Sequence, residues 1–329
     1  MQKFELLGVG NAVVDAVYEV DEVFIKKNKL QKGIMTLIDE NKAESFYSSL
    51  DKGLEIAGGS VANSTVCFRS LSGRSSFIGK IKDDILGKSF STSLLNADVF
   101  YSTEPSTEGP GTARCFIFVT PDAQRTMNTY IGACSNLTPK DINEKLVKNS
   151  KIIYLEGYCW EESLAKESLI KAAEIAHRAG NKVSLTLSDP FCVERHRQEF
   201  LDLIKKHVDI LFANEVETQK LFESNNFEES AKEVAGITEI AALTLGEKGA
   251  KIYNGKESIQ INSKIFGGVK DTTGAGDSFA AGFLYGLSKK FSILRSGNIA
   301  AITAGEIISH FGARPETSLL DLMNKELKE

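Results

Sequence analysis

The 329-residue sequence has few of the residues that build disulfide frameworks and metal centres. Its five cysteines are an odd number and form no CxxC pair. Its four histidines share no metal-ligand spacing with the cysteines. A fold stabilised by disulfides is therefore disfavoured, and we expect reduced, mostly buried thiols.

Charge of one sign and long apolar runs are also scarce. The net charge is −5 and the lysines form no basic stripe, which argues against a nucleic-acid partner. No stretch approaches the roughly 20 apolar residues of a transmembrane helix. Residues 1–20 include Glu5, Asn11 and Asp15 and contain no small-residue cleavage site, so no signal peptide is predicted. We expect a cytoplasmic protein without a membrane or nucleic-acid partner.

The remaining composition is that of an ordinary globular protein. Hydrophobic residues make up 42% of the chain and charged residues 25%. A chain of this length can bury a large core in one large domain or two ordinary ones. Because no internal repeat, low-complexity linker or domain break interrupts it, we expect residues 1–329 to form a single domain.

The second half of the chain alternates strand and helix patterns from residue 151 onward. Continuous apolar runs at 152–155, 182–187, 209–212 and 239–243 alternate with helical patterns near 161–178, 195–207 and 214–223. This alternation predicts a mostly parallel sheet covered by helices on both faces. Ligands of such sheets bind beyond the carboxyl ends of the strands.

Two regions alternate apolar and polar residues instead. They are residues 13–38, and residues 112–120 with 125–131 around the turn PDAQ at 121–124. This pattern is typical of strands exposed on one face, and the turn chemistry predicts a hairpin. We expect a small sheet, built from segments about 13–38 and 110–132, that projects from the main body.

Shorter patterns predict the remaining elements. They are strands at 4–10 and 75–79, helices at 39–50, 60–71 and 84–96, a hairpin of 251–253 with 257–261, and helices from near Gly274, Ile293 and Ser318.

Residues 271–279, DTTGAGDSF, join a loop of small residues to a helix. Gly274 and Gly276 let the backbone turn sharply and approach a ligand, and the first amides of the helix form an anion site. Asp277 lies in the first turn. A carboxylate would repel a bound phosphate, so its presence makes sense if it accepts a proton from a hydroxyl that attacks the phosphate. Taken alone, the same residue also fits a simple helix cap.

Two other glycine-containing segments do not fit the nucleotide motifs that they approach. In Gly87-Lys88-Ser89, the glycine that a P-loop requires upstream falls on Lys82. After Gly8-Val9-Gly10, the third glycine of a dinucleotide fingerprint is replaced by Val13, which disfavours a dehydrogenase.

Together these segments resemble the ribokinase, or PfkB, family of carbohydrate and nucleoside kinases over essentially the whole chain. Residues 57–64, AGGSVANS, resemble the N-terminal signature of the family, and residues 271–279 resemble its C-terminal one. NEVE at 214–217 and TLGEKG at 244–249 resemble its NxxE motif and nucleotide-binding turn. The resemblance implies a three-layer α/β/α domain with a mostly parallel central sheet and a small β-sheet lid.

The resemblance also assigns residues to an acceptor site. Asp15 offers a carboxylate for vicinal hydroxyls, and the amides of Asn11 and Asn63 both donate and accept, which suits a ribose. Gly58 and Gly59 would let backbone amides approach the sugar. Each of these residues, taken alone, also fits a loop cap or a strand-to-helix turn.

The donor site implied by the resemblance takes ATP and Mg²⁺. Thr244, Gly246 and Gly249 belong to the nucleotide-binding turn, and Asn214 and Glu217 would hold Mg²⁺ through its waters. Some family members bind a monovalent cation such as K⁺ beside the anion loop. Asp271, Thr273 and Gly312-Ala313 would frame it in this chain.

The mechanism implied is in-line transfer of the γ-phosphoryl group of ATP to a primary hydroxyl. Asp277 would take the hydroxyl proton, while Gly274 shapes a loop in which the amides of Ala275, Gly276 and Asp277 stabilise the phosphoryl oxygens. Arg125, at the lid hairpin, would reach the transferring group as a mobile clamp. Lid closure would exclude water.

Within the family, the chain is most similar to adenosine-kinase-like members. Met127, Tyr158 and Phe191 are available for an apolar slot that holds a nucleobase. The alternatives are a sugar kinase of the same family and, from another class, a non-catalytic nucleoside sensor. The sequence leaves monomer and homodimer open, because a lid sheet can close over its own site or pair with a second copy.

Overall fold

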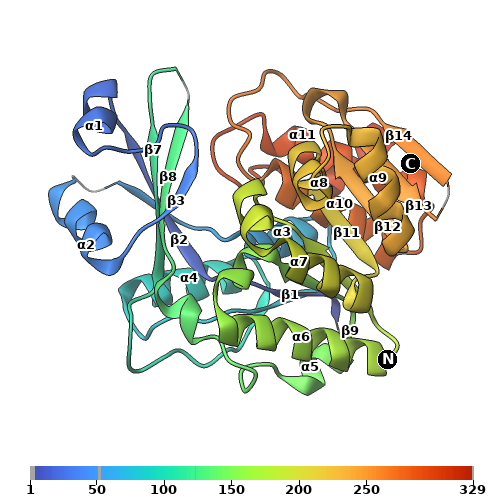
Figure 1. Cartoon of the computed structure of the whole chain (residues 1–329), viewed down its shortest axis with the longest axis horizontal. Coiled ribbons are helices and arrows are strands. Elements are labelled where there is room, and N and C mark those ends of the chain that lie inside the picture. The colour runs from blue at the N-terminus through green and yellow to red at the C-terminus, as the bar shows by residue number, and fades with distance from the viewer. Residues whose placement is uncertain (1–3, 51–52, 123, 256, 328–329) are drawn as a thin grey trace.

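A central sheet of nine strands organises the protein, which was obtained as a computed structural model describing residues 4–50, 53–122, 124–255 and 257–327. The strand order is β14-β13-β12-β11-β10-β9-β1-β5-β6 (Figure 1). Its strands are β1 (Phe4–Val9), β5 (Ser75–Ile78), β6 (Phe100–Tyr101), β9 (Ser150–Glu156), β10 (Lys182–Thr186), β11 (Ile210–Asn214), β12 (Ile240–Thr244), β13 (Ala250–Asn254) and β14 (Glu257–Ile261). Neighbours from β6 to β12 are parallel, and β13 and β14 form the predicted antiparallel hairpin.

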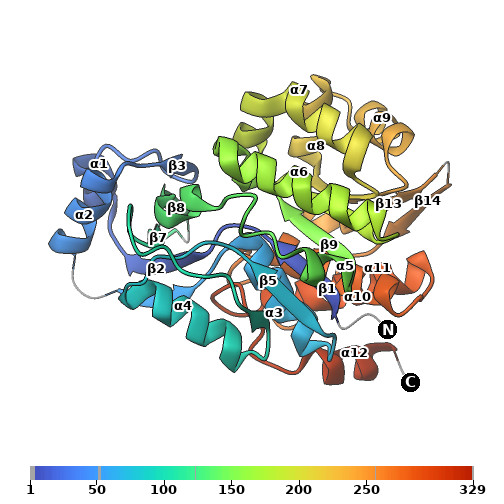
Figure 2. The same ribbon diagram turned by 90° about the horizontal axis from the view of Figure 1, so that it is seen from below.

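Helices cover both faces of this sheet (Figure 2). On one face lie α3 (Ser60–Ser70), α4 (Ile85–Asn96), α10 (Ala275–Ser288), α11 (Ile293–Ile307) and α12 (Leu319–Leu327). On the other lie α5 (Glu144–Lys148), α6 (Ser163–Arg178), α7 (Pro190–His207), α8 (Glu215–Phe222) and α9 (Phe227–Ile237). Two separate apolar cores fill the spaces between sheet and helices, which confirms the three-layer α/β/α fold.

A second sheet of five strands stands beside the first, in the order β3-β8-β7-β2-β4. We call it the lid. It consists of β2 (Val13–Glu19), β3 (Met35–Leu37), β4 (Leu54–Ala57), β7 (Ala113–Val119) and β8 (Arg125–Tyr130). Its outer face packs Phe116 and Phe118 against Ile25 and Phe46 of α1 (Glu22–Lys27) and α2 (Glu40–Ser49). The alternation of strand residues leaves Asp15, Ile117 and Met127 on the face toward the central sheet.

Local chemistry accounts for the differences from the expected elements. The segment 13–38 contains the helix α1, because the Asp21 side chain caps it by accepting from the Phe24 amide. Helix α7 begins at Pro190 rather than near 195, with Asp189 as its N-cap. The lid includes β4, which ends at Ala57, the first residue of the N-terminal signature, and was not expected there. Helix α9 was also not predicted. In the turn of the lid hairpin, Ala123 lies outside the described residues.

Within the ranges given above, no helix is both long and apolar enough to span a membrane.

Candidate active site

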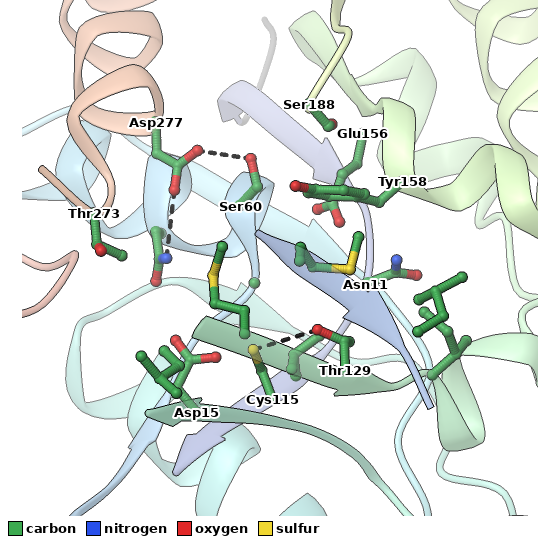
Figure 3. A pocket seen from close by; sticks show the side chains of 18 of the residues that line it. Asn11, Asp15, Ser60, Cys115, Thr129, Glu156, Tyr158, Ser188, Thr273 and Asp277 are labelled. Carbon is green, nitrogen blue, oxygen red and sulfur yellow. Dashed lines mark hydrogen bonds between the residues drawn. The ribbon is translucent and has the colours of Figure 1, made fainter. Parts of the chain in front are cut away.

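A cavity between the lid and the carboxyl ends of β1 and β9 collects most of the predicted acceptor residues. We call it the lid cavity. It is lined by Asn11, Val13, Asp15, Met35, Leu37, Gly59, Ser60, Asn63, Cys115, Ile117, Met127, Thr129, Ile131, Glu156, Tyr158, Glu161, Ser188, Thr273 and Asp277. Figure 3 shows Asp277 and Ser60 across the cavity from Asn11 and Tyr158, with Asp15, Cys115 and Thr129 on the lid side. One wall is polar, and the lid wall is largely apolar.

Asp277 lies in the first turn of α10 and is held by α3. The Ser60 hydroxyl donates to Asp277 Oδ1 at 2.6 Å, and the Asn63 amide donates to Oδ2 at 3.5 Å (Figure 3). Burial raises the pKa of Asp277 from 3.8 to about 6, and the two hydrogen bonds oppose that rise. A carboxylate with this pKa is ionised at neutral pH and is well matched to accept a proton. Ser60 was not among the predicted site residues.

The loop before Asp277 has the geometry of an anion site. Gly274 has φ 76°, and a Cβ there would meet the Cβ of Ala313 at 2.5 Å, so the position requires glycine. Gly276 is helical, and a Cβ there would meet nothing within 4 Å. The Ala275 amide donates to the Thr272 carbonyl at 3.2 Å. The expectation for Ala275 therefore needs correction, since the helix leaves the amides of Gly276 and Asp277 for a ligand.

The predicted acceptor residues Asn11, Asp15, Gly59 and Asn63 all line the lid cavity. Gly58 packs against the Asp15 carboxylate so closely that any side chain would collide with it. Gly59 has φ 91° and lies against the Asn11 carbonyl, so it also requires glycine. Burial, together with the charge of Asp277, raises the pKa of Asp15 to about 7, against the opposing charges of Arg314 and Arg125. The two glycines therefore let the segment before α3 pack closely against Asp15 of β2 and against the Asn11 loop. The expectation for the Gly58 amide needs correction, because it donates to the Val13 carbonyl at 2.8 Å.

Glu156, at the carboxyl end of β9, is a site residue that was not predicted. It is 1% exposed, lines the lid cavity and accepts from the Val61 amide at 3.0 Å. Burial raises its pKa to about 8, while backbone amides of Val61 and Asn11 oppose the rise. Gly10 packs directly against this carboxylate, so the glycine has a packing role. A buried strand ending in Glu before Gly157 was the available sequence signal.

The apolar residues expected to hold a nucleobase separate into two groups. Met127 and Tyr158 line the lid cavity. Phe191 does not, because it lies in the first turn of α7 with its residue surface 46% exposed. Contrary to the expectation, Phe191 therefore does not line the lid cavity. Met35, Leu37, Ile117 and Ile131 of the lid side supply the apolar wall instead.

A second, largely apolar cavity lies beside the β13–β14 hairpin, and we call it the hairpin cavity. Thr244, Gly246 and Gly249 line it together with Ile265, Val269, Phe279, Ala301, Ala304 and Ile308. Gly249 has φ 83° and lies against the Ile261 carbonyl. Gly276 borders this cavity, so a nucleotide whose base lay here would have its phosphates at the anion loop. The residues present fit ATP.

Asn214 and Glu217 line a third cavity, which also contains Asp277 and Gly276. They form a capping box: the backbone amide of Glu217 donates to Asn214 Oδ1 at 2.8 Å, and the backbone amide of Asn214 donates to Glu217 Oε2 at 2.9 Å. Asn214 Nδ2 also donates to Oε1 at 2.7 Å. Because both carboxylate oxygens are engaged, this pair fits Mg²⁺ held through water and phosphate oxygens rather than directly. Among the described residues, no group of His, Cys, Asp or Glu has a metal-binding arrangement.

Arg125 of the lid forms an ion pair with Asp271 and donates to the Thr273 hydroxyl. The Asp271 carboxylate also accepts from the amides of Thr273 and Gly312, each at 2.8 Å. A guanidinium at this carboxylate would repel a monovalent cation, so Asp271, Thr273 and the Gly312-Ala313 segment do not fit K⁺ in this conformation.

Comparison with known proteins identifies the family of this chain. A solved structure of a probable sugar kinase from Rhizobium etli CFN 42 is 42% identical, with TM-score 0.95 and coverage of 100% of this chain and 99% of that one. An adenosine kinase from Sinorhizobium meliloti is 40% identical, with TM-score 0.94 and coverage of 98% and 99%. A probable fructokinase-3 from Arabidopsis thaliana is 27% identical over 249 residues, 73% of this chain and 72% of that protein. The model of the pfkB family carbohydrate kinases matches residues 49–318. The chain therefore belongs to the pfkB family of carbohydrate kinases.

Proposed function

We propose that this kinase transfers the γ-phosphoryl group of ATP to the 5′-hydroxyl of adenosine or a similar purine nucleoside. The observation that carries the proposal is the two-sided lid cavity. Its polar side, with Asn11, Asp15 and Asn63, suits ribose hydroxyls, and its apolar wall includes Met127 and Tyr158. A nucleobase would bury surface against that wall, whereas a free sugar would leave it in contact with water. The 40% identity to an adenosine kinase supports the same acceptor.

The chemical roles follow from position. ATP with Mg²⁺ supplies the phosphoryl group and neutralises its charge. Asp277, ionised at neutral pH, takes the proton of the attacking hydroxyl. The amides of Gly276 and Asp277 stabilise negative charge on the transferring group. Ser60 and Asn63 fix the orientation of the Asp277 carboxylate, so little reorganisation is needed when the acceptor binds.

Arg125 is a proposed clamp that would have to leave Asp271 before it reached the phosphoryl group. Its ion pair ties β8 of the lid to the loop that precedes α10. Negative charge brought by the phosphates would compete with Asp271 for the guanidinium. Closure of the lid over both substrates would then exclude water from the site.

A sugar kinase is the second candidate, and Glu156 favours it. This carboxyl group lines the lid cavity together with Asn11, Asp15 and Asn63, and further polar side chains there are Ser60, Thr129, Glu161, Ser188 and Thr273. These are more polar groups than the hydroxyls of a nucleoside ribose require, and they would suit the additional hydroxyls of a free sugar. The similarity to a fructokinase agrees with this alternative.

ADP release with ATP and Mg²⁺ across a panel of nucleosides and sugars tests the proposal. Adenosine should give a higher kcat/KM than ribose or fructose. A higher value for a free sugar would support the sugar kinase instead. Absence of ADP release with every acceptor, from protein that binds nucleosides, would support a non-catalytic sensor.

A further inference from the structure

Arg314, in the loop after α11, contacts Asn63, which in turn contacts Asp277. Arg314 Nε donates to Asn63 Oδ1 at 3.2 Å, and Nη1 donates to the Ser93 hydroxyl at 2.6 Å. Asn63 and Ser93 lie on α3 and α4, so one guanidinium links the C-terminal loop to both helices. Its Nη2 atom is buried and has no hydrogen-bond partner among the described residues. Nothing in the two signature motifs points to this arginine.

The contact determines the orientation of the Asn63 amide. A guanidinium only donates hydrogen bonds, so the Asn63 atom that faces Arg314 must be the oxygen. The nitrogen then faces Asp277, where it lies 3.5 Å from Oδ2. A flipped amide would place its NH₂ against the guanidinium and its oxygen against the carboxylate. Both contacts would then be repulsive, so Arg314 selects one orientation.

Arg314 also lies in a carboxylate-rich environment. It lines a cavity with Asp15 and Asn63, and its charge opposes the burial that raises the pKa of Asp15. The other charged or titratable groups around Asp15 and Asp277 are Cys67 on α3, Cys115 on β7, Arg125 on β8, Tyr154 and Glu156 on β9, and Tyr158 after β9. Of these, Arg125 is the only other cation, and it is already paired with Asp271.

We propose that Arg314 is a positioning residue for phosphoryl transfer: it turns the Asn63 amide toward Asp277 and offsets the negative charge of Asp15. This inference rests on the proposed role of Asp277 as the base, but it does not depend on which acceptor is used.

Arg314→Met removes both effects, whereas Arg314→Lys keeps the charge and loses the fork that holds Asn63. Measured with the best acceptor of the wild type, the Arg314→Met variant should have a kcat lower by about 10–100-fold. The acidic limb of its pH profile should shift upward by about half to one pH unit. Because the charge of Arg314 acts on Asp15 in the acceptor site, Arg314→Met should also raise KM, and Arg314→Lys should restore KM but not kcat. Ser93→Ala is the matched control, because it removes the Nη1 partner and leaves the Asn63 contact. Its kcat should stay within about twofold of the wild type.

A double-mutant cycle tests whether Arg314 acts through Asn63. In an Asn63→Ala background, Arg314→Met should lower kcat by no more than about twofold. Equal losses in both backgrounds, in variants with wild-type circular dichroism, would overturn the proposal. A substrate-free readout is the ¹³C titration of the Asp277 carboxyl, assigned by its loss in Asp277→Asn. Its midpoint should rise in Arg314→Met and stay in place in Ser93→Ala. An unchanged midpoint in Arg314→Met would also overturn the inference, whatever the acceptor proves to be.

Discussion

The Ser60 hydroxyl donates to the Asp277 carboxylate over 2.6 Å, although 217 positions separate the two residues in the chain. Ser64, one turn further along α3, donates to the Asp277 carbonyl at 2.9 Å. The beginnings of α3 and α10 are thereby fixed against each other at the cavity. The N-terminal signature thus orients the carboxylate that the C-terminal signature supplies.

Asp277→Asn should abolish most turnover while preserving the loop, because the amide is nearly isosteric with the carboxylate but cannot take up a proton. We expect kcat to fall by about 10²–10⁴-fold, with much smaller changes in acceptor affinity. Steady-state kinetics and a binding titration with the variant check this. Near-normal turnover would assign Asp277 to helix capping alone.

Activity should fall steeply at low pH. Asp277 and Asp15 have pKa values near 6 and 7, and both are expected to act as carboxylates. At saturating ATP and Mg²⁺, log kcat/KM should therefore decline as pH drops through 7 and approach a slope of about two below 6, since two protons inactivate the free enzyme. A profile that stays flat down to pH 5 would contradict both assignments.

Gly276→Val and Gly274→Ala should separate catalysis from stability. A side chain at Gly276 meets no protein atom but enters the space beside the anion loop, so activity with ATP should vanish at nearly unchanged Tm. At Gly274, the positive φ and the contact with Ala313 make even alanine destabilising, by about 1–3 kcal/mol. Thermal unfolding and ADP release measure the two effects. A fully active Gly276→Val variant would place the donor phosphates elsewhere.

Met127→Ala should impair phosphorylation of adenosine more than any residual phosphorylation of ribose. Removing about 60 Å² of apolar contact at roughly 25 cal/mol per Å² corresponds to about a tenfold loss of kcat/KM. Phe191→Ala is the matched control, because Phe191 lies outside the lid cavity and should leave both activities unchanged. The nucleobase assignment fails if both acceptors lose equally with Met127→Ala.

The buried carboxyl groups should make the protein less stable as pH rises. Burial raises the pKa of Glu156 to about 8 and that of Glu217 to about 7 from 4.5, so the folded state binds protons that the unfolded state has released. The free energy of unfolding should then decrease as pH rises from about 4.5 to 8. Glu156→Gln mimics the protonated form and should flatten this decline, as measured by urea unfolding at pH 5 and pH 8.5. An equally steep decline in the variant would contradict the assigned pKa.

The fold could be predicted from the sequence because the patterns that indicate its strands and turns are local. Continuous apolar runs such as 152–155 and 182–187 predicted buried parallel strands, and their periodicity does not depend on distant contacts. The glycines of both signatures were equally readable, since a positive φ at Gly59 or Gly274 is a local backbone property. The anion loop, the residues Thr244, Gly246 and Gly249 of the hairpin cavity, and most of the polar residues expected in the lid cavity could therefore be named in advance.

Tertiary contacts decided which side chains share a cavity. Phe191 had the right chemistry, but it lies in the first turn of α7, half exposed and outside the lid cavity. Glu156 and Arg314 belong to no motif, and their roles arise because β9 and the loop after α11 meet α3 beside Asp277. The sequence by itself determined the layers, the lid and the proposed base at position 277. Only the tertiary structure decided the charge balance around Asp277. Burial, and the distances between carboxylates and guanidinium groups, exist only once segments far apart in the chain have packed together.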